Sequence, residues 1–174
     1  ILSTGMSGMV GTRVCNLLDE SFEFTDMSLD RGVNIMDEQQ VEQWMKESSA
    51  EVVLHMAAKT NVDQCEDDKI LGEEGEAWLV NVVGTKNIVA KAKELGKRVI
   101  YISTDFVFDG VEKEYGEDDA PNPVNWYGVT KYEGENAVAE AGGRYAILRI
   151  AYPYAHFAGG KMDFVERVKQ VLAE

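Results

Sequence analysis

A glycine-rich turn at the start of the sequence constrains the fold more than any other feature. Residues Ile1–Ser3 look like the end of a buried strand, and they run directly into the segment TGMSGMVG at Thr4–Gly11. An apolar-periodic helix pattern follows. A strand, a glycine turn and a helix in this order predict a dinucleotide-binding unit. Gly5 would permit the tight turn, Gly8 the approach of a pyrophosphate, and Gly11 the close packing of helix on strand.

Two further expectations accompany this turn. The helix that follows it would offer free N-terminal amides to phosphate groups, whereas the alternative is that the glycines only turn the chain. Because the first strand begins part-way, we also expect that the natural chain starts a few residues earlier.

Strand-like and helix-like patterns alternate five times along the chain. Short apolar runs predict strands at Ile1–Ser3, Phe22–Thr25, Val52–His55, Arg98–Ser103 and Tyr145–Arg149. Helical periodicity predicts helices after the glycine turn, at Val41–Lys46, Trp78–Leu95 and Tyr127–Ala141, and from Asp163 after a loop at Ala151–Met162. This alternation predicts an α/β fold, a Rossmann-like doubly wound parallel sheet with helices on both faces.

Composition restricts the partners. The 174 residues are 45% hydrophobic, which suits one globular domain, and no apolar run approaches the roughly 18 residues that cross a bilayer. With 17 basic and 31 acidic residues the net charge is -14, so we expect no nucleic acid and no membrane among the partners, and a cytoplasmic location. Cys15 and Cys65 show no metal-ligand spacing, so no metal site is expected and both should be buried or incidental thiols.

Two charged residues near the second strand bear on the choice of dinucleotide. Asp26, at the end of that strand, would accept hydrogen bonds from an adenosine ribose, which favours NAD. Arg31 follows closely and would meet a 2′-phosphate, which favours NADP. The choice between NAD and NADP therefore stays open.

The carboxyl edge of the predicted sheet carries small and polar residues. His55 ends an apolar run, where a lone histidine is more often a core residue than a catalytic base. Ala57 and Ala58 follow it, and Ser103, Thr104 and Asp105 follow or end the fourth strand. Because ligands bind beyond the carboxyl ends of parallel strands, chemistry is expected at this edge.

Tyr127 and Lys131 form a candidate catalytic pair. They are four residues apart in a predicted helix, so the phenol and the ammonium share one helix face. A nearby lysine favours the phenolate and would lower the pKa of the tyrosine from its usual value of about 10. Taken alone the spacing is a weak signal, because such pairs are also common on solvated helix faces.

Five motifs occur in a fixed order: TGMSGMVG at Thr4–Gly11, HMAAKTNVDQCE at His55–Glu66, NVVGTKNI at Asn81–Ile88, YISTDFVFDG at Tyr101–Gly110 and NWYGVTKYEGE at Asn125–Glu135. This order resembles the extended short-chain dehydrogenases/reductases over nearly the whole chain. The form STDFVFDG, together with LRIAYPYA at Leu148–Ala155, is similar specifically to the dTDP-4-dehydrorhamnose reductase family. Members of that family are longer, so the resemblance implies an NAD(P)-binding Rossmann domain at residues 1–150 and, at 151–174, the start of a substrate-binding portion that is largely absent.

The resemblance also implies roles for individual residues in the NAD(P)H-dependent reduction of a 4-keto sugar nucleotide. Tyr127 would be the general acid, Lys131 would lower its pKa and hold the nicotinamide ribose, and Thr104 would hydrogen-bond the substrate oxygen. The implied cofactor-binding residues are Gly5, Ser7, Gly8, Met9, Gly11, Asp26, Asn34, Ile35, Ala57, Ala58, Lys59, Asn81, Ser103, Tyr127 and Lys131. The implied substrate-binding residues are Val62, Asp63, Thr104, Asp105 and Tyr152, the last standing where many members carry tryptophan.

Two alternative functions share these motifs. The regulatory beta subunit of methionine adenosyltransferase is similar across them, which implies a non-catalytic subunit that binds NADP and another protein. A sugar-nucleotide epimerase or dehydratase would share the fold and retain bound NAD. The resemblance further implies a homodimer, formed by the helices at Trp78–Leu95 and Tyr127–Ala141, and leaves the exact sugar and any Mg²⁺ requirement open.

Overall fold

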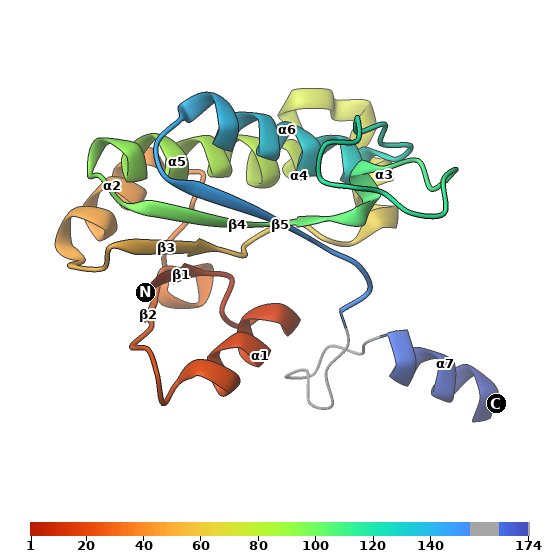
Figure 1. Cartoon of the computed structure of the whole chain (residues 1–174), viewed down its shortest axis with the longest axis horizontal. Helices are drawn as coiled ribbons and strands as arrows, with labels where there is room; N and C mark the ends of the chain where they lie inside the picture. Colours follow the sequence, from red (N-terminus) through yellow and green to blue (C-terminus); the bar gives the residue numbers. More distant parts are fainter. Residues whose placement is uncertain (154–163, 174) are drawn as a thin grey trace.

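A parallel sheet forms the centre of the protein in the computed structural model, which describes residues 1–153 and 164–173 (Figure 1). Its five strands lie in the order β2-β1-β3-β4-β5. They are β1 (Leu2–Thr4), β2 (Thr25–Asp26), β3 (Val52–His55), β4 (Arg98–Thr104) and β5 (Tyr145–Ile150). The chain moves outward from β1 to β2 and then crosses back to β3, so the switch point at which such sheets bind ligands lies between β1 and β3.

Helices cover both faces of this sheet. Helix α1 (Met9–Leu18) lies on one face, whereas α2 (Glu38–Glu47), α5 (Thr85–Glu94) and α6 (Trp126–Ala141) lie together on the other (Figure 1). This is the arrangement that right-handed crossovers produce when the strand order reverses once. The predicted fold class, a doubly wound Rossmann-like α/β sheet, is confirmed.

Most of the remaining helical segments are shorter than eight residues, and four of them lie between β3 and α5 in the sequence. They are η1 (Leu29–Arg31), α3 (Val62–Asp68), η2 (Lys69–Glu74), α4 (Glu76–Trp78), η3 (Leu79–Gly84), η4 (Asp105–Val107) and α7 (Phe164–Ala173). Within the described ranges, no helix combines the length and the apolar character that a membrane crossing requires.

The main core lies between the sheet and the three helices α2, α5 and α6. Its side chains are at most a few per cent exposed, and each such large apolar group stabilises the fold by roughly 1.5–3 kcal/mol relative to an exposed one. They include Leu2, Val41, Met45, Val53, Ile88, Val99, Tyr101 and Val138.

The second strand, predicted from Phe22 and ending at Asp26, begins later than predicted. The observed strand is Thr25–Asp26, and the Phe22 side chain is 50% exposed. The backbone amides of Ser21 and Phe22 both donate to the carbonyl oxygen of Leu18, so these residues close the end of α1 instead of pairing with β1. The aromatic content of the segment favoured a strand, but the backbone amides at its start are hydrogen-bonded to the last turn of α1.

The helix predicted at Trp78–Leu95 is present but is not a uniform α-helix. A continuous helical run extends from Glu76 to Glu94, and its central part, η3, is a π-helix. Helix α3 was not predicted at all. The predicted loop at Ala151–Met162 lies largely outside the described residues, as does the predicted helix start at Asp163, and α7 is described from Phe164.

Candidate functional site

A cavity of about 610 Å³ lies at the carboxyl edge of the sheet, between the start of α1 and the start of α6. This volume falls within the usual range for small-molecule sites. The predicted site residues that line it are Gly5, Ser7, Gly8, Met9, Gly11, Asn34, Ile35, Ala57, Ala58, Val62, Ser103, Thr104, Asp105, Tyr127, Lys131 and Tyr152. The structure thus brings together residues that span almost the whole sequence.

The glycine turn forms one end of the cavity. Gly5 has a φ of +70°, and a side chain there would place its Cβ 2.7 Å from the backbone nitrogen of Ala57. Only glycine therefore allows the turn and the loop after β3 to lie this close. No side chain caps the N terminus of α1, which begins after Gly8. The first amides of a helix lack partners within it, so this end of the cavity suits an anionic group such as a phosphate.

A buried histidine supports the floor of the cavity. His55 is fully buried; its Nδ1 lies 2.7 Å from the Thr4 hydroxyl and its Nε2 3.0 Å from the Thr85 hydroxyl. Burial, and to a lesser extent the charge of Lys131, lowers the pKa of His55 to about 3, so the ring is neutral. The Thr4 hydroxyl also accepts hydrogen bonds from the backbone nitrogens of Met56 and Ala57. The prediction that His55 is a core residue is confirmed.

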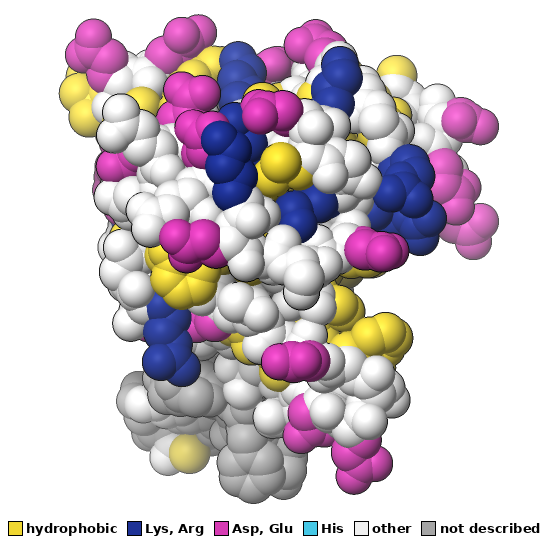
Figure 2. Space-filling model, turned by 90° about the vertical axis from the view of Figure 1, so that its left-hand side faces the viewer, with side chains coloured by type: hydrophobic (Ala, Val, Ile, Leu, Met, Phe, Trp, Pro, Cys, Tyr) yellow, Lys and Arg dark blue, Asp and Glu magenta, His cyan; other side chains and the backbone are white. Residues whose placement is uncertain are grey.

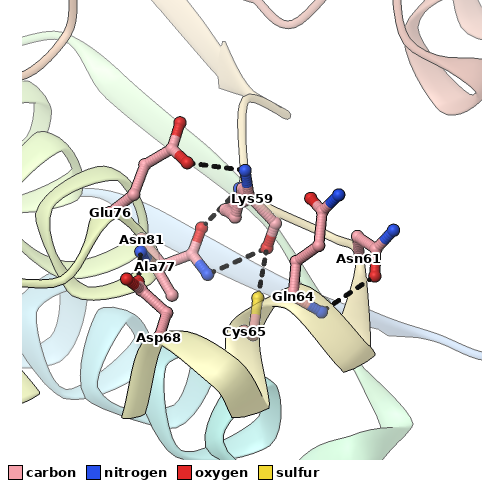
Figure 3. Close-up of polar contacts among 8 residues, drawn as sticks. All are labelled: Lys59, Asn61, Gln64, Cys65, Asp68, Glu76, Ala77 and Asn81. Carbon is pink, nitrogen blue, oxygen red and sulfur yellow. Dashed lines mark hydrogen bonds and ion pairs between the residues drawn. The ribbon is translucent and has the colours of Figure 1, made fainter. Parts of the chain in front are cut away.

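The Asn81 side chain fixes the loop after β3 at Lys59 (Figure 3). Its Oδ1 accepts a hydrogen bond of 2.8 Å from the backbone nitrogen of Lys59, and its Nδ2 donates to the Lys59 carbonyl oxygen at 3.1 Å. The same Nδ2 donates to the Thr130 hydroxyl on α6 at 2.9 Å. The Lys59 ammonium forms an ion pair of 2.6 Å with Glu76, which lines the cavity. Asn81 therefore ties the loop after β3 to the helix that carries Tyr127 and Lys131.

The predicted catalytic residues lie side by side at the end of β4. Thr104, Tyr127 and Lys131 are 5%, 9% and 2% exposed. The Thr104 hydroxyl donates to the Asp105 carboxylate at 3.1 Å and lies near the Tyr127 phenol, whose pKa it acts to lower. The Lys131 ammonium donates to the carbonyl oxygen of Ile102 at 2.8 Å. The ammonium also lies 4.0 Å from the centroid of the Tyr101 ring. Such a contact with an aromatic face favours the charged form of the lysine.

Local sequence explains how α6 presents these groups. The Asn125 side chain caps the helix by accepting a hydrogen bond from the backbone nitrogen of Gly128. A Cβ on Gly128 would collide with the carbonyl oxygen of Phe106, so glycine at this position lets the first turn of α6 lie against η4. Tyr127 consequently reaches Thr104.

The pKa of Tyr127 lies above the ordinary value for a tyrosine. Burial raises its pKa to about 12, and the Thr104 hydroxyl opposes this only in part. Burial lowers the pKa of Lys131 to about 7, while Glu135 acts to raise it. In this structure the Lys131 ammonium is hydrogen-bonded to the carbonyl oxygen of Ile102, and the expectation that Lys131 lowers the pKa of the phenol stays a prediction. The phenol stays protonated at neutral pH, which is the form that a proton donor requires.

Four predicted residues lie outside the lining of the cavity: Asp26, Lys59, Asp63 and Asn81. The Asp26 carboxylate accepts a hydrogen bond of 3.0 Å from the Ser28 hydroxyl and lies 3.7 Å from Nε of Arg31. Asp63 is exposed in the first turn of α3. Asp26 thus reaches the cavity only through Ser28, which does line it.

Other lining residues were missed by sequence reasoning. Met27, Ser28, Leu29 and Asp30 follow β2, and the rule that ligands bind beyond carboxyl ends of strands would have found them. Glu76 and Val80 come from a helical run whose approach to the cavity depends on tertiary packing, so no local signal identifies them. No group of three or more potential metal ligands occurs among the described residues.

Comparison with known proteins places this site in a family. The model of the RmlD substrate binding domain family matches residues 1–174. The chain belongs to this family. The resemblance to the dTDP-4-dehydrorhamnose reductase family is confirmed, since a dTDP-4-dehydrorhamnose reductase from Mycolicibacterium smegmatis is 33% identical over 175 residues, which cover 99% of this chain and 51% of the relative.

Two further similarities bear on the fold and on the function. Methionine adenosyltransferase 2 subunit beta from Xenopus laevis is 34% identical over 160 residues, covering 88% of this chain and 46% of that protein. The crystal structure of dTDP-4-dehydrorhamnose reductase from Bacillus anthracis in complex with NADP is 30% identical, with a TM-score of 0.87, and the match covers 98% of this chain and 58% of that one. The chain thus spans about half the length of the relatives it matches.

Proposed function

We propose that the chain is the cofactor-binding part of an NAD(P)H-dependent reductase that acts on a 4-keto sugar nucleotide. The observation that carries the proposal is the convergence of Thr104, Tyr127 and Lys131 on a cavity whose other end is the glycine turn. The uncapped start of α1 and the close approach at Gly5 fit a dinucleotide pyrophosphate. Relatives named as dTDP-4-dehydrorhamnose reductases support this substrate class.

Each residue has a defined task in this reaction. A nicotinamide held in this cavity would supply a hydride for the carbonyl carbon of the substrate. Tyr127 gives its phenolic proton to the carbonyl oxygen, so that a ketone becomes an alcohol. Thr104, which lies near the phenol, holds the same oxygen, and the Lys131 ammonium stabilises the phenolate that remains.

The part of the chain that contacts the sugar follows the fifth strand. We assign residues 1–150 to cofactor binding and 151–174 to the start of the substrate-binding portion. Tyr152 and Val62 line the cavity beside Asp105 and are the residues we expect against the sugar. We also expect a cytoplasmic location and a homodimer formed through α5 and α6. On the face in Figure 2, acidic and basic side chains are interspersed, without the continuous basic surface that nucleic acid requires.

The decisive experiment is reduction of dTDP-4-dehydrorhamnose by the full-length protein. Oxidation of NADPH and NADH is followed by absorbance for the wild type and for Tyr127→Phe. The variant should lose activity about 100-fold or more, because the proton donor is absent, while its affinity for the cofactor stays similar. Tyr132→Phe on the same helix serves as the matched control. Equal rates for wild type and Tyr127→Phe, or no turnover with either cofactor, would refute the proposal.

A second candidate is a regulatory subunit that binds NADP and a partner enzyme without turnover. The similarity to methionine adenosyltransferase 2 subunit beta favours it. Its test is nucleotide binding without sugar reduction, combined with stoichiometric co-purification of an enzyme partner. A sugar-nucleotide epimerase or dehydratase remains a third prediction, and NAD that stays bound through purification would support it.

A further inference from the structure

A buried ion pair lies one helical turn beyond Lys131. Glu135 on α6 is 3% exposed, and Arg149 on β5 grips its carboxylate with two hydrogen bonds, from Nε at 3.0 Å and from Nη2 at 2.7 Å. Two parallel bonds of this kind fix both the position and the orientation of the carboxylate. Glu135 does not line the cavity, so it takes no direct part in binding.

Arg149 is itself held on its other side. Its guanidinium lies 4.9 Å from the centroid of the Phe108 ring, and that ring stacks on Tyr115 at 4.3 Å. The hydrogen bonds that Arg149 donates to Glu135 raise the pKa of Arg149, so it stays charged. The Glu135 carboxylate is therefore held by the charged guanidinium of Arg149, which also contacts the Phe108 ring.

Lys131 needs a compensating negative charge, because burying an ammonium disfavours the charged form. Lys131 interacts with Glu135 on α6, with the Tyr101 ring on β4 and with His55 on β3. Tyr127 and Asp105 line the same cavity as Lys131.

Most of these groups bring Lys131 no negative charge. His55 is neutral, and burial raises the pKa values of Tyr101 and Tyr127, so both phenols keep their protons. Asp105 accepts a hydrogen bond from Thr104. Glu135, four residues after Lys131 on the same buried face, is the group that acts to raise the pKa of the lysine.

We propose that Glu135 is a positioning residue that keeps Lys131 protonated, with Arg149 fixing its carboxylate for this task. The inference depends on the proposed function only for the role of Lys131 in the reaction. Its central claim, that the charge of Lys131 depends on Glu135, concerns the protein without any ligand.

The test is a direct titration of Lys131 by NMR. The full chain is labelled with ¹³C at the lysine Cε atoms, and Lys131→Arg identifies the signal. We expect Glu135→Gln to move the midpoint of Lys131 to lower pH by about one unit or more, because a nearby opposite charge is removed. Glu140→Gln, an exposed carboxylate on the same helix, should leave the midpoint unchanged. An unchanged midpoint in Glu135→Gln would overturn the inference.

A double variant separates the charge of Glu135 from damage to the fold. Glu135→Gln alone leaves the partly exposed Arg149 without its carboxylate partner, so Glu135→Gln/Arg149→Met is measured beside it, with thermal unfolding as a check of the fold. We expect the double variant to fold and to keep the lowered midpoint. A return to the wild-type midpoint would mean that Arg149, and not Glu135, sets the charge of Lys131, which also overturns the inference. Neither titration result depends on sugar reduction. If the inference about Glu135 fails, the proposed reductase function is still tested separately by Tyr127→Phe.

Discussion

Replacing Asn81 should weaken both the fold and the cofactor site. The side chain is 1% exposed and makes three hydrogen bonds, two with the backbone of Lys59 and one with Thr130. Each such bond contributes about 1 kcal/mol net, so Asn81→Ala should lower the free energy of unfolding by about 3 kcal/mol. Urea denaturation measures this loss. Asn16→Ala, at an exposed position of α1, is the control and should change stability by less than about 0.5 kcal/mol.

A second variant tells hydrogen bonding from packing at this position. Asn81→Leu preserves most of the volume but provides neither donor nor acceptor, so it should lose nearly as much stability as Asn81→Ala. We also expect NADPH, titrated by fluorescence, to bind both variants more weakly, because the loop at Ala57–Lys59 loses its support. If Asn81→Leu is as stable as the wild type, the hydrogen bonds do not hold the loop and the reasoning fails.

Two further predictions concern cofactor choice and pH. Asp26→Ser should shift the ratio of NADH to NADPH affinity at least about 10-fold toward NADPH, because a carboxylate disfavours a 2′-phosphate. Calorimetric titration of both cofactors measures this ratio. An unchanged ratio would show that Asp26 does not select between the two cofactors. Because the folded pKa of His55, about 3, lies below its unfolded value of 6.5, the unfolded state binds the extra proton. Stability should therefore fall by roughly 1.4 kcal/mol per unit as pH drops from 6.5 toward 3, and less steeply in His55→Gln; parallel slopes in urea denaturation would contradict this.

The fold and the cluster at its carboxyl edge could be predicted because their signals are local. The glycine turn at Gly5, the β-branched strand ending at His55 and the spacing of Tyr127 and Lys131 each report on a few neighbouring residues. One topological rule then brings them together, since the carboxyl ends of parallel strands share one edge. The cavity accordingly contains most of the residues predicted for it.

The features that were missed depend on tertiary contacts. Phe22 has a strand-like side chain, but its amide is taken by the end of α1. Burial raises the pKa of Tyr127, and the spacing of residues in a sequence does not report burial. Glu76 reaches the cavity only because α4 packs beside the loop that carries Lys59.

The π-helical segment at Leu79–Gly84 has a consequence for how this site tolerates change in length. A π-turn amounts to one extra residue inside an α-helix, and it rotates the preceding part of the helix relative to the part that follows. Deletion of a single residue next to Asn81 would restore a regular helix and improve its internal hydrogen bonding. It would also turn the amide of Asn81 away from Lys59 and Thr130. A mutation that makes the helix more regular would thus disconnect the loop after β3 from helix α6.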